Sequence, residues 1–338
     1  MEANRDYQER ARQLQQMREQ LRPLDLQTWL VPSPLEQACL QFYGILFTDE
    51  RVQQSVGYLD HQGQRIALYR FRPQRVSASC FLLHGYYDHV GLYGHLIRFL
   101  LENGVEVVAF DLPGHGLSDG ERASIDEFGH YRSVLKTLIS SAERAALPKP
   151  WLGMGQSTGG AILADWALGE GRDCFDQLLL LAPLLRPHRW PLARVAHYLL
   201  RPFVKAIPRS YSDNSSDHAF LQFVRHQDPL QPRTLPVAWV GALARWIPHM
   251  LAASPSPLAV LVVQGDEDHT VDWRFNLSAY QRLFPAARVL TLAGAGHHLA
   301  NESIPLRKRY LQWLSQNLIL ERGGGVEVNG YTRGSIAE

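Results

Sequence analysis

The chain has 338 residues, of which 46% are hydrophobic and 20% are charged. This composition is typical of a globular protein and excludes a wholly disordered or collagen-like chain. The 34 basic and 33 acidic residues give a formal net charge of +1, and no block of basic residues occurs, so nothing in the sequence indicates nucleic-acid binding.

The first predicted element is an amphipathic helix within residues 1–30. Its apolar residues recur at spacings of three and four: Tyr7, Ala11, Leu14, Met17 and Leu21. Pro23 ends the pattern. Two alternatives remain for the apolar side, which either packs on the main body or lies at a membrane surface. Because the chain shows neither an apolar signal region nor a stretch of ~18 apolar residues, we expect a cytoplasmic protein, free or peripheral on the inner face of the membrane.

From residue 65 onward, β-rich runs alternate with helical patterns. The predicted strands are Arg65–Phe71, Ala78–Leu83, Glu106–Phe110, Trp151–Met154, Leu178–Ala182, Leu258–Val263 and Arg288–Leu292. The predicted helices between them cover residues 93–101, 128–145 and 159–168. Several strands are apolar at consecutive positions, as strands covered on both faces are. The alternation predicts an α/β fold with a mostly parallel central sheet flanked by helices.

The alternation stops in residues 186–250. This segment holds eight of the twenty prolines, nine arginine and lysine residues but only three aspartates, and no run that predicts a strand. It is either a loop-rich insertion with solvated arginines or a lid near an anionic group of a substrate or membrane. We therefore divide the chain into a core of residues 31–185 and 251–320, this insertion, and a loose, glycine-rich tail of residues 321–338.

A Gly-x-Ser-x-Gly pattern is formed by Gly155, Ser157 and Gly159, directly after a predicted strand and before a helix. This context is typical of a nucleophile elbow, in which a tight turn exposes the serine hydroxyl. Glycine is needed on both sides because a Cβ atom would clash where the backbones approach. Ser157 is the predicted nucleophile; the alternative is a serine that merely packs a helix on the sheet.

A nucleophilic serine needs a base and a carboxylate that orients the base. Two later loops follow predicted strands and supply both groups. Asp266 and Asp268 lie in the first loop, and His297 and His298 lie in the second. By chain position alone, either aspartate and either histidine fits.

An oxyanion formed at Ser157 needs backbone N–H donors. Gly85, in the loop after the strand Ala78–Leu83, allows that loop to approach the serine. We expect the N–H groups of Tyr86 and Thr158 to be the donors, and His84 to order the loop rather than to perform chemistry.

Together these residues resemble the α/β-hydrolase superfamily, and within it the branch of monoacylglycerol lipases and bacterial lysophospholipases. The matching segments are His84-Gly85 with His89, Asp111–Ser118, the elbow, Gly265–Val271 and Gly294–His297. They cover roughly residues 65–318. The resemblance implies the α/β-hydrolase fold, with residues 186–250 as a helical lid.

Carried over position by position, the resemblance makes Ser157 the nucleophile, Asp268 the acid and His297 the base. Asp266 and His298 stay as rivals. Two departures stand out. Gln156 and Thr158 flank the serine where the branch usually has histidine and methionine, and Tyr86-Tyr87-Asp88 replaces small residues and glutamate.

The resemblance implies ester hydrolysis through an acyl-enzyme, without a metal or organic cofactor. The expected substrate is a monoacyl lipid, either a lysophospholipid or a monoacylglycerol. An acyltransferase, a thioesterase or a small-ester carboxylesterase would use the same triad, and a peptidase or carbon–carbon bond hydrolase is less supported. A non-catalytic binding protein on the same fold is the alternative from a different class. Labelling of Ser157 by a fluorophosphonate distinguishes it from an enzyme.

Overall fold

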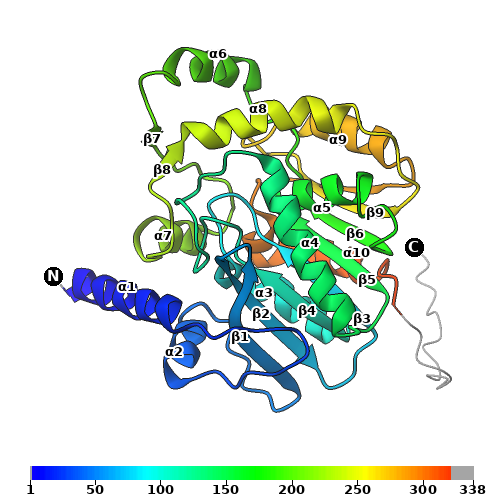
Figure 1. Cartoon of the computed structure of the whole chain (residues 1–338). Coiled ribbons are helices and arrows are strands. Elements are labelled where there is room, and N and C mark those ends of the chain that lie inside the picture. Colours follow the sequence, from blue (N-terminus) through cyan, green and yellow to red (C-terminus); the bar gives the residue numbers. More distant parts are fainter. Residues whose placement is uncertain (1, 321–338) are drawn as a thin grey trace, which may run out of the picture.

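An eight-stranded sheet forms the centre of the protein in the computed structural model, which describes residues 2–320 (Figure 1). Its strands are β1 (Val52–His61), β2 (Gln64–Pro73), β3 (Ala78–Leu83), β4 (Val105–Phe110), β5 (Trp151–Gln156), β6 (Gln177–Leu181), β9 (Ala259–Gly265) and β10 (Arg288–Leu292). They lie in the order β1-β2-β4-β3-β5-β6-β9-β10. β2 is antiparallel to both neighbours, and all other neighbouring strands are parallel.

All seven predicted strands are present, and the mostly parallel α/β sheet is confirmed. Every residue of β3, β4, β5 and β6 is buried, because helices cover both faces of the sheet. β1 was not predicted. It pairs with β2 through a two-residue turn at Gln62 and Gly63, which both have positive φ, the geometry of a tight hairpin.

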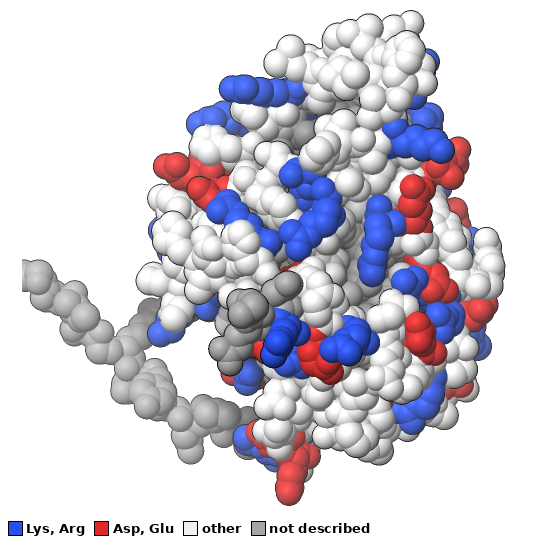
Figure 2. All heavy atoms as spheres, turned by 90° about the vertical axis from the view of Figure 1, so that its left-hand side faces the viewer, with Lys and Arg blue, Asp and Glu red and all other residues white. Residues whose placement is uncertain are grey.

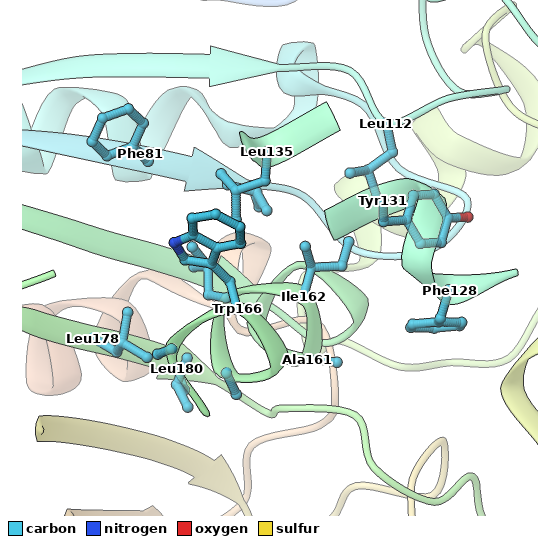
Figure 3. Packing of buried hydrophobic residues seen from close by; sticks show 14 of the residues in the cluster. Phe81, Leu112, Phe128, Tyr131, Leu135, Ala161, Ile162, Trp166, Leu178 and Leu180 are labelled. Atoms are coloured by element: carbon cyan, nitrogen blue, oxygen red, sulfur yellow. The ribbon is translucent and has the colours of Figure 1, made fainter. Parts of the chain in front are cut away.

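Two hydrophobic clusters lie on opposite faces of the sheet. One contains side chains of α4 (Phe128–Arg144), α5 (Thr158–Leu168) and α9 (Trp273–Leu283). Figure 3 shows part of it, including Trp166 of α5 and Leu135 of α4. The other contains side chains of α3 (Gly94–Glu102), which follows the 3₁₀ turn η1 (Val90–Tyr93), and of α10 (Ile304–Ser315), preceded by η2 (Leu299–Asn301).

The N-terminal segment packs into the second cluster. Leu14 and Met17 of α1 (Glu2–Gln20) are buried beside α2 (Pro34–Phe42). The apolar side of the first helix therefore packs on the body rather than facing outward. α2 was not predicted, although its start carries a capping box in which Ser33 and Glu36 exchange hydrogen bonds.

The chain between β6 and β9 carries the helices α6 (Trp190–Leu200), α7 (His218–His226) and α8 (Val237–Leu251). The expectation that residues 186–250 contain no strand was wrong: β7 (Ala206–Pro208) and β8 (Thr234–Pro236) form a short antiparallel pair. α8 is anchored by buried Leu243 and Met250, whereas α6 projects at the top of Figure 1. We call residues 186–250 the insertion.

Within residues 2–320, no helix combines the length and the apolar character needed to cross a lipid bilayer. The tail predicted for residues 321–338 lies outside the described residues.

Candidate active site

Ser157 occupies the turn between β5 and α5 with φ 51° and ψ −112°, a strained conformation for a residue with a side chain. Its N–H donates to the carbonyl of Leu181 at 2.8 Å. A Cβ atom on Gly159 would lie 2.3 Å from the carbonyl oxygen of Leu83, and one on Gly155 would lie 2.5 Å from the Gly159 carbonyl carbon. Both positions therefore require glycine.

His297 connects Ser157 to Asp268. Its Nε2 lies 2.9 Å from the Ser157 hydroxyl oxygen, and its Nδ1 lies 2.7 Å from Oδ2 of Asp268. Asp268 follows β9 and His297 follows β10, so the carboxyl ends of the parallel strands bring the three residues together. In the tautomer that fits these two partners, Nδ1–H donates to the carboxylate and Nε2 accepts from the serine hydroxyl.

The Asp268 carboxylate is buried, and its oxygens accept several hydrogen bonds from the protein. Besides His297, it accepts hydrogen bonds from the backbone N–H groups of Thr270 and Val271 and from Nε2 of Gln264. Burial opposes ionisation, yet His297 and these donors hold the pKa of Asp268 below its ordinary value. Asp268 is therefore charged at neutral pH and orients the imidazole.

The two rival residues have other partners. Exposed Asp266 accepts the Gly294 N–H at 2.8 Å. His298 Nε2 lies 3.1 Å from Oδ2 of Asp88. Neither rival forms a hydrogen bond to Ser157 within residues 2–320.

Residues 85–89, which we call the oxyanion loop, are held by buried polar groups. Asp88 accepts from the Tyr93 hydroxyl at 2.9 Å, and this hydroxyl accepts the Gly85 N–H at 2.8 Å. A Cβ atom on Gly85 would lie 2.9 Å from the Asp88 carboxylate and 3.5 Å from the Cβ of Ser157. Glycine thus lets the loop approach the serine.

His84 orders the start of this loop. The Leu112 N–H donates to its Nε2 at 2.8 Å, so its Nδ1–H donates to the Gly85 carbonyl at 2.7 Å. Burial, together with nearby His115, lowers the pKa of His84 to about 3. The imidazole is therefore neutral and acts as a fixed support.

Tyr86 and Thr158 line a cavity of about 260 Å³ together with Ser157 and His297. Within residues 2–320, neither backbone N–H donates to another backbone group. The Thr158 N–H is free because it belongs to the first turn of α5. Both amides are thus available for an acceptor beside the serine hydroxyl. No group of three or more histidine, cysteine or acidic residues in the described chain is arranged to hold a metal.

Sequence reasoning missed the contacts between the insertion and the oxyanion loop. Trp239 stacks on Tyr86 with ring centroids 3.8 Å apart, and the guanidinium of Arg209 lies 4.1 Å from the ring centroid of Tyr87. Asp228 pairs with His89 at 2.9 Å, and both side chains are buried. No sequence pattern marks these residues, because they meet the loop only through tertiary packing.

Comparisons with known proteins identify the family of the chain. Residues 74–304 match a family model described as serine aminopeptidase, S33. The chain is 26% identical over 198 residues to a monoacylglycerol lipase of Mycolicibacterium smegmatis, covering 56% of this chain and 70% of the lipase. It is 25% identical over 212 residues to phospholipase YtpA of Bacillus subtilis, covering 61% and 81%.

Among solved structures, a soluble variant of monoglyceride lipase from Saccharomyces cerevisiae is similar in fold. It matches with a TM-score of 0.68 and 19% identity, covering 80% of this chain and 95% of that one. The family match extends over more than half of the 338 residues. The chain therefore belongs to the serine aminopeptidase S33 family and has the α/β-hydrolase fold.

Proposed function

We propose that the protein is a serine hydrolase that cleaves carboxylic esters of monoacyl lipids through an acyl-enzyme. The observation that carries this proposal is the chain of hydrogen bonds from Ser157 through His297 to Asp268. The relatives named as lipase and phospholipase support the lipid ester as substrate.

In this mechanism His297 Nε2 removes the Ser157 proton while the hydroxyl oxygen attacks the acyl carbonyl carbon. The N–H groups of Tyr86 and Thr158 hold the oxyanion, each supplying about 3–4 kcal/mol of transition-state stabilisation. His297 then gives its proton to the leaving alcohol. Water attacks the acyl-enzyme by the same steps and regenerates Ser157.

The cavity supports an ester with an apolar acyl group. Its wall includes Leu184, Leu221, Val224 and Leu235 as well as Ser157 and His297. An aminopeptidase would need a carboxylate for the substrate's free amine. Asp88 is the one carboxylate among the described lining residues, and His298 and Tyr93 already occupy it. An acyltransferase or thioesterase would use the same residues and is separated by product analysis.

We also propose that the insertion is a lid whose helix α6 contacts a membrane surface. Seven of the exposed large apolar residues in the described chain lie between positions 192 and 207. Exposed Arg194, Arg201 and Lys205 lie in the same segment. Apolar side chains flanked by cations suit the interface of a membrane that contains anionic lipid.

The central test is the substitution Ser157→Ala. We expect the turnover of p-nitrophenyl butyrate to fall at least ~10³-fold, as in other enzymes that lose a nucleophilic serine, and fluorophosphonate labelling to disappear. Ser210→Ala is the matched control, because this serine lines the same cavity, and it should keep both properties. Near-normal turnover by Ser157→Ala would refute the proposed function.

A further inference from the structure

The side chain of Arg209 is unusual among the cations of the insertion. It lines the cavity that contains Ser157, and its guanidinium lies between Tyr87 and Tyr211, 4.1 and 4.4 Å from their ring centroids. Arginine stacks on aromatic faces in this way, and its planar guanidinium presents donors that match a carboxylate or a phosphate. Tyr87 directly follows Tyr86, so the guanidinium lies beside the oxyanion loop.

Arg209 has no carboxylate partner among residues 2–320. Its Nη1 donates to neutral acceptors, the side-chain oxygen of Gln231 at 2.5 Å and the carbonyl of Pro232 at 3.3 Å. Within the same described range, neither its Nε nor its Nη2 has a hydrogen-bond acceptor. Elsewhere in the chain, the same edge of an arginine binds a carboxylate. The Nε and Nη2 atoms of Arg51 lie 2.9 and 2.6 Å from the two carboxylate oxygens of Asp49.

Arg209 has no ion pair in the described chain, although the carboxylates of Asp88 and Asp228 act on its guanidinium from farther away. Their side chains are held by other partners, Tyr93 and His298 for Asp88 and His89 for Asp228.

Arg225 also lines the cavity, but Asp213 neutralises it at 2.5 Å. The upper half of the face in Figure 2 shows more basic than acidic side chains, which would draw an anionic substrate toward the cavity. An acyl chain carries no charge, so an anion in a monoacyl lipid lies in its head group, as a phosphate.

We propose that Arg209 binds the head-group phosphate of the substrate through its Nε and Nη2 edge, which makes a phosphate-bearing monoacyl ester the preferred substrate over the neutral monoacylglycerol. This inference rests on the proposed ester hydrolysis at Ser157. Arg209 is then a specificity-determining residue, because its effect is confined to substrates that carry the phosphate.

The test compares 1-hexanoylglycerol 3-phosphate with 1-hexanoylglycerol, both kept monomeric so that no lipid surface contributes charge. We expect Arg209→Gln to lower kcat/KM about 10- to 100-fold for the phosphate ester, the range for a lost hydrogen bond to a charged group, mainly through KM. For the neutral ester the change should stay within threefold. Arg209→Lys keeps the charge but loses the paired donors, so it should be intermediate.

Arg225→Gln is the matched control. We expect it to change the ratio of the kcat/KM values for the two substrates less than threefold. A binding readout is inhibition of p-nitrophenyl butyrate hydrolysis by sn-glycerol 3-phosphate, which should be competitive in the wild type and lost in Arg209→Gln.

An equal loss of kcat/KM on both esters in Arg209→Gln would show that Arg209 only supports the fold of β7 and β8. An unchanged ratio would overturn the inference while leaving ester hydrolysis intact. Absence of any Ser157-dependent hydrolysis would instead reject the proposed function.

Discussion

Gln156 precedes Ser157 and ties the elbow to the loop that carries His297. Its Nε2 donates to the carbonyl oxygen of His297 at 2.7 Å, and its Oε1 accepts the Ala300 N–H at 3.3 Å. The side chain is buried, so both hydrogen bonds are shielded from water. Gln156 thereby fixes the distance between the serine turn and the histidine loop, and we assign it a positioning role.

Replacement of Gln156 by leucine should lower kcat for p-nitrophenyl butyrate about tenfold or more with little change in KM. The leucine leaves a buried carbonyl and N–H without partners, and small displacements of reacting groups cost up to ~10²-fold. Gln177→Leu is the matched control, because Gln177 makes the same pair of bonds, to Asn317 and Ile319, at the opposite end of the sheet. Equal loss of kcat in both variants would contradict the positioning role.

At the scale of elements, the parallel strands were predictable because each is a short apolar run next to a helical pattern. β1 was missed because polar residues such as Gln53, Gln54 and Ser55 interrupt its alternation, and its pairing with β2 depends on the turn. β7 and β8 have three residues each, too few for any periodicity. Such strands form only because the rest of the insertion brings them together.

α6 and the turn that follows it carry an apolar surface that the fold does not cover. Leu199 and Phe203 are 60% and 85% exposed. We expect Leu199→Ser combined with Phe203→Ser to reduce co-sedimentation with vesicles of phosphatidylglycerol and phosphatidylcholine at least tenfold, because burying each side chain contributes roughly 1.5–3 kcal/mol. Hydrolysis of p-nitrophenyl butyrate should stay unchanged.

Val31→Ser is the control for this experiment, since Val31 is 80% exposed but lies between α1 and α2. Binding that is equally strong in the α6 double variant and the wild type would contradict the proposed membrane contact. Stronger binding to vesicles with more phosphatidylglycerol would support the role of the neighbouring cations.

At the scale of the whole molecule, the site depends on chain order and on the sheet together. The order of Ser157, Asp268 and His297 could be predicted because each follows a strand whose carboxyl end reaches the same edge. The choice between Asp268 and Asp266 needed the family pattern. The two aspartates lie in the same loop, and chain position does not show which carboxylate faces His297. The contacts that the insertion makes with the oxyanion loop could not be predicted, because Arg209, Asp228 and Trp239 lie in no recognisable pattern.

The same burial that supports the site makes the protein sensitive to acid. His84 and His115 are fully buried, and burial is the main cause that lowers their pKa values to about 3 and about 4. In the unfolded chain both titrate near pH 6.5. Between pH 6.5 and 4 the unfolded state therefore binds more protons, and stability falls as the pH falls. The pKa of His89 is raised by Asp228 against the effect of burial, so near pH 6.5 its folded state binds more protons than its unfolded state and it acts in the opposite sense there.

We expect the free energy of unfolding, measured in urea by tryptophan fluorescence, to fall by up to ~1.4 kcal/mol per pH unit for each of these histidines between pH 6.5 and 4.5. Burial raises the pKa of Asp111. At the low end of this pH range the folded state therefore binds more protons at this residue, which increases stability as the pH falls. His115→Asn can keep the hydrogen bond to the Pro113 carbonyl without titrating, so it should flatten the dependence, whereas exposed His269→Asn should not. Stability that stays constant or rises toward pH 4.5 would show that these imidazoles take up protons in the folded state.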